Sequence, residues 1–177
     1  MTAMRVGLVS DTHGLVDPRL PEVLEGAELV LHAGDIVKPE VLAVLREIAP
    51  VKAVRGNNDE GLPAFARLPE TALVEVGALT LLLVHDLGAR ERPKLPARQL
   101  LARHRPELVV HGHSHRPGAA RVGDTLFVNP GSAGPRRFSL PRTVAMLEVQ
   151  GRAVRVTYFD LTRDPPTPFG DPIEAAL

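Results

Sequence analysis

Short apolar runs that each end in a residue able to bind a metal ion recur along the sequence. Five such runs are followed by carboxylate, amide or imidazole side chains: Asp11 with His13, Asp35, Asn57, His85, and His113 with His115. Ligands bind at the carboxyl ends of strands in open α/β sheets, so side chains that follow such strands are expected to converge. A single Asp or His after a strand is usually a turn or capping residue. The recurrence, and not any one residue, therefore indicates a site.

The donor types of these seven residues suit a pair of divalent transition-metal ions. Asp11 with His13, and His113 with His115, stand two positions apart, which places both donors on one face of an extended chain. If one carboxylate bridges two ions, the set offers four bonds to each ion. Nitrogen and oxygen donors without sulfur suit Mn, Fe, Co, Ni or Zn and fit Mg or Ca poorly. A hydroxide held between the ions, its pKa lowered from that of bulk water, could attack a bound phosphate in line.

Composition excludes several other classes of site and partner. The chain has 177 residues, with 21 Lys and Arg against 21 Asp and Glu, and it contains no cysteine. Without cysteine, disulfides, thiolate metal sites, iron–sulfur clusters and a cysteine nucleophile are excluded. Zero formal charge and few aromatic residues argue against general nucleic-acid binding. No apolar stretch reaches about 20 residues and the start lacks a signal-peptide pattern, so no membrane partner and a cytoplasmic location are expected.

The elements that must position these side chains follow an α/β rhythm. Strands are expected at 5–9, 29–31, 51–54, 108–110, 125–128, 143–149 and 153–161. Apolar spacing predicts helices at 18–26, 39–49 and 96–105, and a hairpin that joins the runs 71–76 and 79–84. Residues 61–70 are expected as a loop or a broken helix. A single domain is predicted over residues 1–161, followed by a proline-rich C-terminal tail at 162–177 that is either loose or draped over a neighbouring element.

Five motifs, in order along the chain, resemble those of the calcineurin-like metallophosphoesterase superfamily. They are Asp11-Thr12-His13, Gly34-Asp35, Gly56-Asn57-Asn58-Asp59, His85 after a strand, and Gly112-His113-Ser114-His115. The sequence is more similar to the small, single-domain YfcE/MJ0936-like phosphodiesterase branch, and Asn129-Pro130-Gly131-Ser132 also fits that branch. One such motif would be weak evidence. Five motifs in the same order, spread over nearly the whole chain, are specific evidence for this family.

The resemblance implies an α/β fold, a four-layer αββα sandwich of two mixed sheets flanked by helices, with a dinuclear metal site at one edge of the sheets. The family's metal-binding positions fall here into two sets joined by a bridge: Asp11, His13 and His115 for one ion, Asn57, His85 and His113 for the other, and Asp35 for both. Asp35, Asn57 and His85 are also expected to act in catalysis. The cofactors would be two divalent transition-metal ions, Mn first and Ni, Fe, Co or Zn as alternatives. Relatives hydrolyse small phosphodiesters, and many form homo-oligomers.

Two positions depart from the family pattern. Asn58 stands where many members have a histidine that protonates the leaving group. Leaving-group protonation is therefore expected to fall to water or to another side chain, and aryl esters should react much faster than alkyl esters. Asp86 replaces a glycine that usually follows the ligand histidine. Its carboxylate could bond a neighbouring ligand or backbone amide, or it could add negative charge that weakens phosphate binding.

Several other polar residues have two interpretations each. His111 precedes His113 by two positions and is a candidate for orienting the site, and His32 is either a support of the site or a satisfied core histidine. Arginines in the second half of the chain could clamp a phosphate, although surface salt bridges are their commoner role: Arg116, Arg136, Arg137 and Arg142.

The predicted function is hydrolysis of phosphodiesters by a dinuclear-metal-dependent enzyme. Two alternatives remain open at this point. The same ligand set could serve phosphomonoesters or nucleotides, which a comparison of a diester with a monoester would decide. The chain could also be a non-catalytic scaffold that kept the fold, which failure to bind any transition metal would favour. Function resides in the site and not in the fold, so the substrate itself is not implied by the resemblance.

Overall fold

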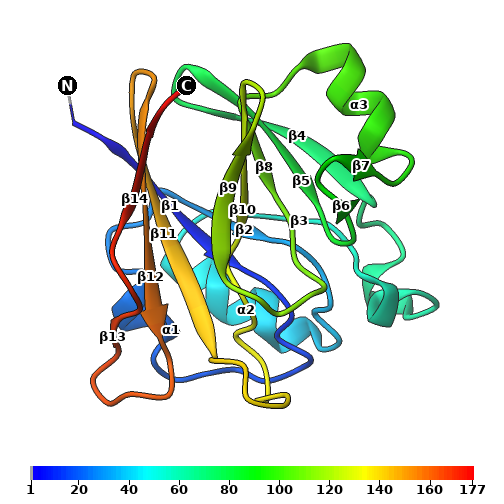
Figure 1. Cartoon of the computed structure of the whole chain (residues 1–177). Coiled ribbons are helices and arrows are strands. Elements are labelled where there is room, and N and C mark those ends of the chain that lie inside the picture. Colours follow the sequence, from blue (N-terminus) through cyan, green and yellow to red (C-terminus); the bar gives the residue numbers. More distant parts are fainter. Residues whose placement is uncertain (1) are drawn as a thin grey trace.

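The computed structural model describes residues 2–177 and consists of two mixed β-sheets that lie face to face (Figure 1). The first sheet has the strand order β13-β12-β11-β1-β2-β3, and β14 also pairs with β12. Its strands are β1 Met4–Val9, β2 Leu29–His32, β3 Val51–Ala53, β11 Thr143–Gln150, β12 Ala153–Asp160, β13 Thr167–Pro168 and β14 Ile173–Ala176. The second sheet has the order β4-β5-β8-β10-β9. Its strands are β4 Thr71–Val76, β5 Leu79–Val84, β8 Leu108–Val110, β9 Gly118–Val122 and β10 Thr125–Asn129.

Each sheet contains a parallel group of strands whose carboxyl ends lie at the same edge. In the first sheet β1, β2 and β3 run parallel, and in the second β5, β8 and β10 do. The remaining pairings, such as β1 with β11 and β4 with β5, are antiparallel. The metal-binding candidates of the sequence lie in the loops that follow five of these six parallel strands, all except β10.

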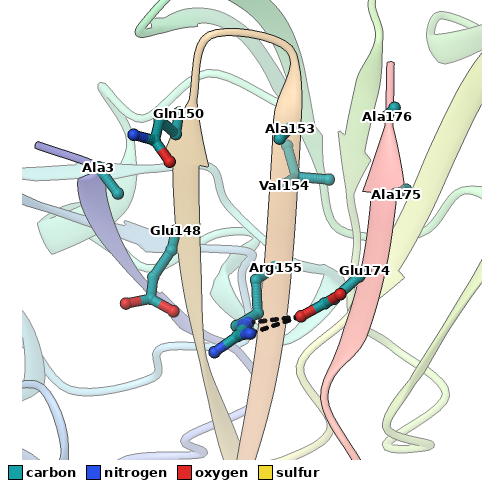
Figure 2. Close-up of a pocket in the computed structure, with 9 residues that line it drawn as sticks. All are labelled: Ala3, Glu148, Gln150, Ala153, Val154, Arg155, Glu174, Ala175 and Ala176. Carbon is teal, nitrogen blue, oxygen red and sulfur yellow. Dashed lines mark hydrogen bonds and ion pairs between the residues drawn. The ribbon is translucent and has the colours of Figure 1, made fainter. Parts of the chain in front are cut away.

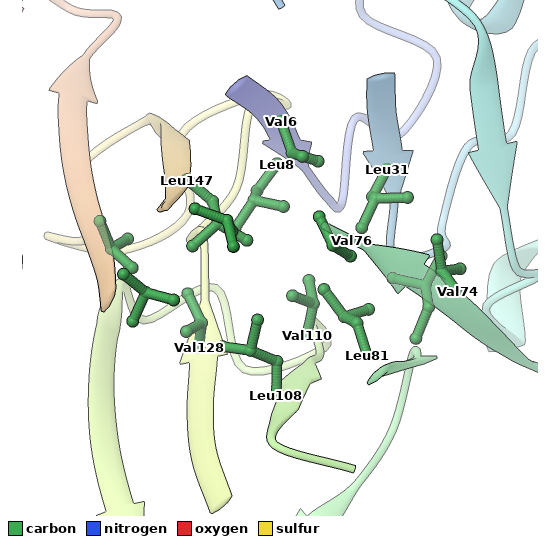
Figure 3. Packing of buried hydrophobic residues seen from close by; sticks show 14 of the residues in the cluster. Val6, Leu8, Leu31, Val74, Val76, Leu81, Leu108, Val110, Val128 and Leu147 are labelled. Carbon is green, nitrogen blue, oxygen red and sulfur yellow. The ribbon is translucent and has the colours of Figure 1, made fainter. Parts of the chain in front are cut away.

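The main hydrophobic core fills the space between the two sheets (Figure 3). Figure 3 shows Leu8 and Leu31 from the first sheet meeting Leu81 and Val110 from the second. All four are fully buried, because alternate residues along each strand face the opposite sheet. Burying a Val or Leu side chain stabilises the fold by about 1.5–3 kcal/mol. This packing fixes the two sheets, and hence their carboxyl edges, relative to each other.

Helices cover the outer faces and complete four layers. Helix α1, Leu20–Val23, and helix α2, Pro39–Ile48, pack on the first sheet. Pro39 suits the first turn of α2, where its missing N–H has no helical partner, and Leu42 and Leu45 face the sheet. Helix α3, Ala97–His104, covers the second sheet through contacts with Leu82 and Phe127. The αββα architecture predicted from the sequence is confirmed.

Several elements differ from the sequence-based expectation. The helix expected at 18–26 is reduced to α1, whereas residues 61–70 form the expected loop, with a 3-10 turn at Pro63–Phe65. Strand β9 and the hairpin of β6, Gly88–Ala89, with β7, Arg92–Pro93, were not expected. Of the two arrangements expected for residues 162–177, the structure has the one in which the segment lies on a neighbouring element, because β13 and β14 pair with β12 and extend the first sheet. Within residues 2–177, no helix is long and apolar enough to cross a membrane.

Candidate metal centre

The loops after β1 and β2 are joined by backbone hydrogen bonds that bring their polar residues together. The N–H of Asp11 donates to the Gly34 carbonyl at 3.0 Å, and the N–H of His13 donates to the Asp35 carbonyl at 2.9 Å. The loop after β8, on the second sheet, joins them through the N–H of His113, which donates to Asp11 Oδ2 at 3.0 Å. Candidates from both sheets therefore share one edge of the sandwich.

A first group of donors consists of Asp11, His13 and His115. Their ligand atoms lie within 4.8 Å of one another. His115 Nε2 is 3.2 Å from Asp11 Oδ1 and 3.2 Å from His13 Nε2. Asp11 Oδ1 is buried and has no hydrogen-bond partner in the part of the chain that the structure describes. A buried carboxylate oxygen without a partner, beside two facing imidazole nitrogens, fits a cation held between the three.

A second group is formed around Asn57 and His85. Asn57 Oδ1 lies 3.1 Å from His85 Nε2 and 3.2 Å from His113 Nδ1. His85 Nε2 is 3.4 Å from Asp35 Oδ1, and its Nδ1 donates to the Ala33 carbonyl at 2.7 Å. That bond leaves Nε2 unprotonated in the neutral ring and free to bind a metal ion.

Asp35 lies between the two groups. Its Oδ1 faces His85, whereas its Oδ2 is 3.8 Å from His13 Nε2 in the first group. Asn58 fixes the carboxylate by donating its backbone N–H to Oδ1 at 2.9 Å and its side-chain amide to Oδ2 at 2.6 Å. One carboxylate with an oxygen directed at each group is the arrangement that a bridging ligand needs.

Both carboxylates of the centre are held in the ionised form. Burial raises the pKa of Asp35. The hydrogen bond and the charge of His85, together with the hydrogen bonds from Asn58, lower it by more, so the pKa of Asp35 is well below its usual range. Burial likewise raises the pKa of Asp11 while His115 and His85 lower it, with a net decrease. The site therefore presents two negative charges at neutral pH.

The backbone is strained where these side chains enter the site. Among the described residues, eight other than glycine have positive φ angles, and five of them are candidates for metal binding: Asp11 (+53°), His13 (+45°), Asp35 (+56°), His113 (+68°) and His115 (+58°). The left-handed region is disfavoured for residues with a Cβ, and such strain concentrates at functional sites. Regular strand geometry would point successive side chains to opposite faces, whereas these turns direct them inward.

Two glycines are required by close approach of the chain to the ligands. A Cβ on Gly56 would collide with the backbone N and Oδ1 of Asp35, and a Cβ on Gly112 would collide with Ser10 Oγ and Asp11 Oδ2. Both positions therefore need a residue without a Cβ.

Several residues that sequence reasoning left without a role hold the loops in place. Asp59 is buried and accepts from the N–H groups of Ile36 and Val37 at 2.9 and 2.8 Å, and from that of Gly56 at 2.8 Å. Asn129 donates its side-chain amide to the Gly112 carbonyl at 3.0 Å. Both residues belong to motifs that the sequence analysis singled out, which was the available signal. Their roles could not be inferred, because most of their bonding partners lie far away in sequence.

Two residues with open interpretations, Asp86 and His111, now have defined surroundings. The Asp86 carboxylate accepts from Lys94 Nζ at 2.6 Å and from the Gly88 N–H at 3.1 Å, and the oxygen nearer Lys94 is 3.7 Å from His113 Nε2. His111 is buried, and its Nδ1 lies 3.5 Å from the side-chain amide of Asn129. No bond from the His111 ring to the seven metal-binding candidates is found in residues 2–177.

Arg142 does not reach toward a phosphate. Its guanidinium donates to the Gly134 and Ala133 carbonyls at 2.6 and 2.8 Å and to Asp17 Oδ2 at 2.6 Å. The expectation that it could clamp a phosphate is therefore not supported by its contacts. Instead it fixes the base of the loop that follows Ala133.

His32 is a core histidine with both ring nitrogens bonded. Its Nδ1 accepts from the Gly34 N–H at 3.2 Å, so its proton is on Nε2, which lies 3.0 Å from Thr12 Oγ1. Burial lowers the pKa of His32 to about 4, with nearby carboxylates such as Asp11 opposing that decrease. The neutral ring therefore bonds the loop before Asp35 to the loop after β1.

Acid should destabilise the metal-free protein partly through His32. In the unfolded chain histidine has a pKa of about 6.5, so the folded state resists proton uptake, and stability is lost as pH falls from about 6.5 toward 4. The expected contribution is about 3 kcal/mol across that range. Denaturant unfolding at pH 7 and pH 4.5 should show a smaller acid loss in His32→Gln, which can make both bonds without taking up a proton. Equal losses in the two proteins would contradict this role.

Two hollows differ in their relation to the centre. The larger, of about 570 Å³, lies on the first sheet between β11, β12 and β14, where Arg155 pairs with Glu174 at 2.6 Å (Figure 2). None of the seven metal-binding candidates lines it. The smaller, of about 210 Å³, is lined by Asn57, His85, Asp86 and Lys94 among others and therefore adjoins the site. Chemistry, rather than size, identifies the relevant hollow.

Comparison with known proteins gives a consistent result. The family model described as calcineurin-like phosphoesterase superfamily domain matches residues 4–152. A "probable metallophosphoesterase" of Methanothermobacter thermautotrophicus is 30% identical over 155 residues, which are 84% of this chain and 87% of the relative. Phosphodiesterase YfcE of Escherichia coli K12 is 30% identical over 170 residues, with 82% and 88% covered. Among solved structures, Vacuolar Protein Sorting 29 from Cryptosporidium parvum covers 100% of both chains with a TM-score of 0.81 and 22% identity, a likeness in fold.

Proposed function

Since the chain belongs to the calcineurin-like phosphoesterase superfamily, we propose that it is a phosphodiesterase that depends on two divalent metal ions. Seven residues would hold the ions in two groups: Asp11, His13 and His115 in the first, Asn57, His85 and His113 in the second, and Asp35 in both. When bound, the ions would supply a nucleophile formed from water and would offset negative charge on the phosphoryl group. The names of the two relatives, a metallophosphoesterase and a phosphodiesterase, support this function.

The observation that carries the proposal is the placement of Asp35. Its Oδ1 lies 3.4 Å from His85 Nε2 and its Oδ2 lies 3.8 Å from His13 Nε2, so each oxygen is near a different group of donors. A structural carboxylate would need only one partner on each oxygen, and Asn58 already supplies both of these. The additional imidazoles are explained by a cation on each side of Asp35.

The charge of the centre favours an anionic substrate. Asp11 and Asp35 are ionised, and two negative charges offset only half of the charge of two divalent cations. The remaining positive charge would attract the phosphate group of an ester. Mn is the first candidate for the ions, with Ni, Fe, Co or Zn as alternatives, because all five accept mixed nitrogen and oxygen donors. The expected homo-oligomer and the cytoplasmic location stay predictions.

The proposed function is tested by metal removal and return. Protein stripped with EDTA should not hydrolyse bis(4-nitrophenyl) phosphate, and addition of Mn²⁺ should restore hydrolysis. The same preparation should act more slowly on 4-nitrophenyl phosphate, a monoester with the same chromophore. Faster hydrolysis of the monoester would replace the diesterase by a phosphomonoesterase that uses the same site.

A non-catalytic scaffold is the second candidate, because the fold extends to a protein named for vacuolar protein sorting. The metal-binding set argues against it, since a purely structural surface gains nothing from five strained backbone positions around a buried carboxylate oxygen, Asp11 Oδ1, that has no hydrogen-bond partner among the described residues. Calorimetric titration with Mn²⁺ separates the two. A protein that binds no transition metal, or binds metal and hydrolyses neither ester, would favour the scaffold.

A further inference from the structure

The smaller hollow beside the metal centre has the position of a leaving-group pocket. Asn57 and His85, two of the metal-binding candidates, line it together with Lys94, Leu95 and Pro96. It holds about 210 Å³, enough for the alcohol portion of a small ester. A phosphate placed over the metal centre would thus have one ester oxygen directed into this space.

Lys94 brings an ammonium group to this hollow. The hairpin β6–β7 leads directly to it, and its backbone N–H donates to the Leu87 carbonyl at 2.9 Å. Its Nζ donates to Asp86 Oδ2 at 2.6 Å, and that same oxygen lies 3.7 Å from His113 Nε2. The ammonium is therefore one carboxylate away from the metal centre. Its side chain is 60% exposed, so it can regain a proton from water.

Other polar side chains that line the hollow cannot supply a proton at neutral pH. Arg55 pairs with Glu70 at 2.7 Å, and a guanidinium keeps its protons in proteins. Glu60, Glu70 and Asp86 are carboxylates without a proton to give. His85 donates its Nδ1 proton to the Ala33 carbonyl. The Thr71 hydroxyl and the Asn57 amide can donate hydrogen bonds but are too weakly acidic to transfer a proton. Among the described lining residues, this leaves Lys94 as the side chain with a proton to transfer.

We propose that Lys94 is a catalytic residue that protonates the leaving group of the ester, in place of the histidine that position 58 lacks. As the phosphorus–oxygen bond breaks, its electron pair stays on the leaving oxygen, and one ammonium proton moves to that oxygen. The alcohol departs, Lys94 is left as a neutral amine, and water returns the proton. Water is consumed, and a phosphomonoester and an alcohol are formed. The inference rests on the proposed phosphodiesterase function.

Asp86 is the positioning residue in this scheme. The sequence left open whether its carboxylate bonds a neighbour or repels phosphate, and its contact with Lys94 favours the first interpretation. The Lys94 ammonium neutralises the charge of the Asp86 carboxylate, so Asp86 does not present a free negative charge to the substrate. It also holds the ammonium on the same carboxylate oxygen that lies 3.7 Å from His113 Nε2.

The first test compares leaving groups. In Lys94→Ala, kcat for diesters with an alkyl leaving group should fall by about 100-fold, whereas diesters with a 4-nitrophenyl leaving group, which needs no proton, should lose less than about threefold. Lys94→Arg should not restore the alkyl ester, because arginine keeps the charge without giving up a proton. Lys52→Ala, at an exposed position on β3, is the matched control. Equal losses for both leaving groups, or rescue by arginine, would overturn proton donation by Lys94.

The second test does not depend on turnover. Acetic anhydride labels exposed lysines, and mass spectrometry measures the extent at each site. A non-hydrolysable phosphonate diester, added to Mn²⁺-loaded protein, should protect Lys94 several-fold and leave Lys52 unprotected. Unchanged labelling of Lys94 would show that no part of the ester reaches it. If the wild type is active and Lys94→Ala has the same kcat for alkyl diesters, this inference alone is refuted. If the Mn²⁺-loaded wild type is inactive, the proposed function and the inference are refuted together.

Discussion

Replacing Asp35 by Asn should lower diester hydrolysis by about 1000-fold or more and abolish tight binding of a second metal ion. The amide keeps the size of the side chain and can still accept from the Asn58 N–H, but it removes the negative charge that faces His85 and His13. In the variant, no negative charge lies between the two groups of donors, so two bound cations would repel each other more strongly. Kinetics with bis(4-nitrophenyl) phosphate and calorimetric titration with Mn²⁺ measure the two effects.

Matched controls separate loss of the bridge from loss of the fold. Asp124→Asn removes an exposed carboxylate in the turn before β10 and should change neither activity nor metal binding. Thermal unfolding of metal-free Asp35→Asn should remain cooperative, because the main core between the sheets is untouched. Full activity in a well-folded Asp35→Asn protein would contradict the bridging role.

A methyl group at position 112 should also disrupt the centre, although this substitution leaves all seven metal-binding candidates unchanged. In Gly112→Ala the new Cβ would lie 2.5 Å from Asp11 Oδ2 and would collide with Ser10 Oγ. Both atoms are fixed, because Ser10 Oγ donates to Asp11 Oδ2 at 2.6 Å and the His113 N–H donates to the same oxygen. Relief requires the loop after β1 or the loop after β8 to move.

The expected result is a 10- to 100-fold weaker affinity for Mn²⁺, of the order seen when partners of metal ligands are removed, and a loss of about 1–3 kcal/mol in stability from overpacking. Gly123→Ala is the control. Gly123 has a positive φ of +59° but open space around it, so alanine there should cost some stability and leave metal affinity unchanged. If Gly112→Ala bound Mn²⁺ as tightly as the wild type, Asp11 would not need its present position to bind the ion.

The layers and the metal-binding candidates could be predicted because short segments of the sequence are enough to recognise both. β-branched runs that end in Asp or His mark a strand and its following loop together, as at Val9 to Asp11 and at Val110 to His113. Strand β9 escaped prediction because its burial is only partial, and the C-terminal strands because prolines dominate their surroundings. Their pairing with β10 and β12 depends on contacts that no local pattern records.

The supports of the site were harder to predict than its ligands. Asp59 bonds to residues more than twenty positions earlier, and Asn129 to a carbonyl seventeen positions earlier, so neither role follows from its own segment. Asp86 was ambiguous for the same reason. Its partner Lys94 stands eight positions later, across a hairpin that the sequence did not predict. Residue type identified the chemistry, whereas the folded chain decided which groups meet.

Two metal ions should share the Asp35 carboxylate. Anomalous diffraction from crystals grown with Mn²⁺ tests this directly. We predict two anomalous peaks about 3.5–4 Å apart, one beside Asp11, His13 and His115 and the other beside Asn57, His85 and His113. A single peak that does not contact Asp35, or no peak within this set of residues, would contradict the claim.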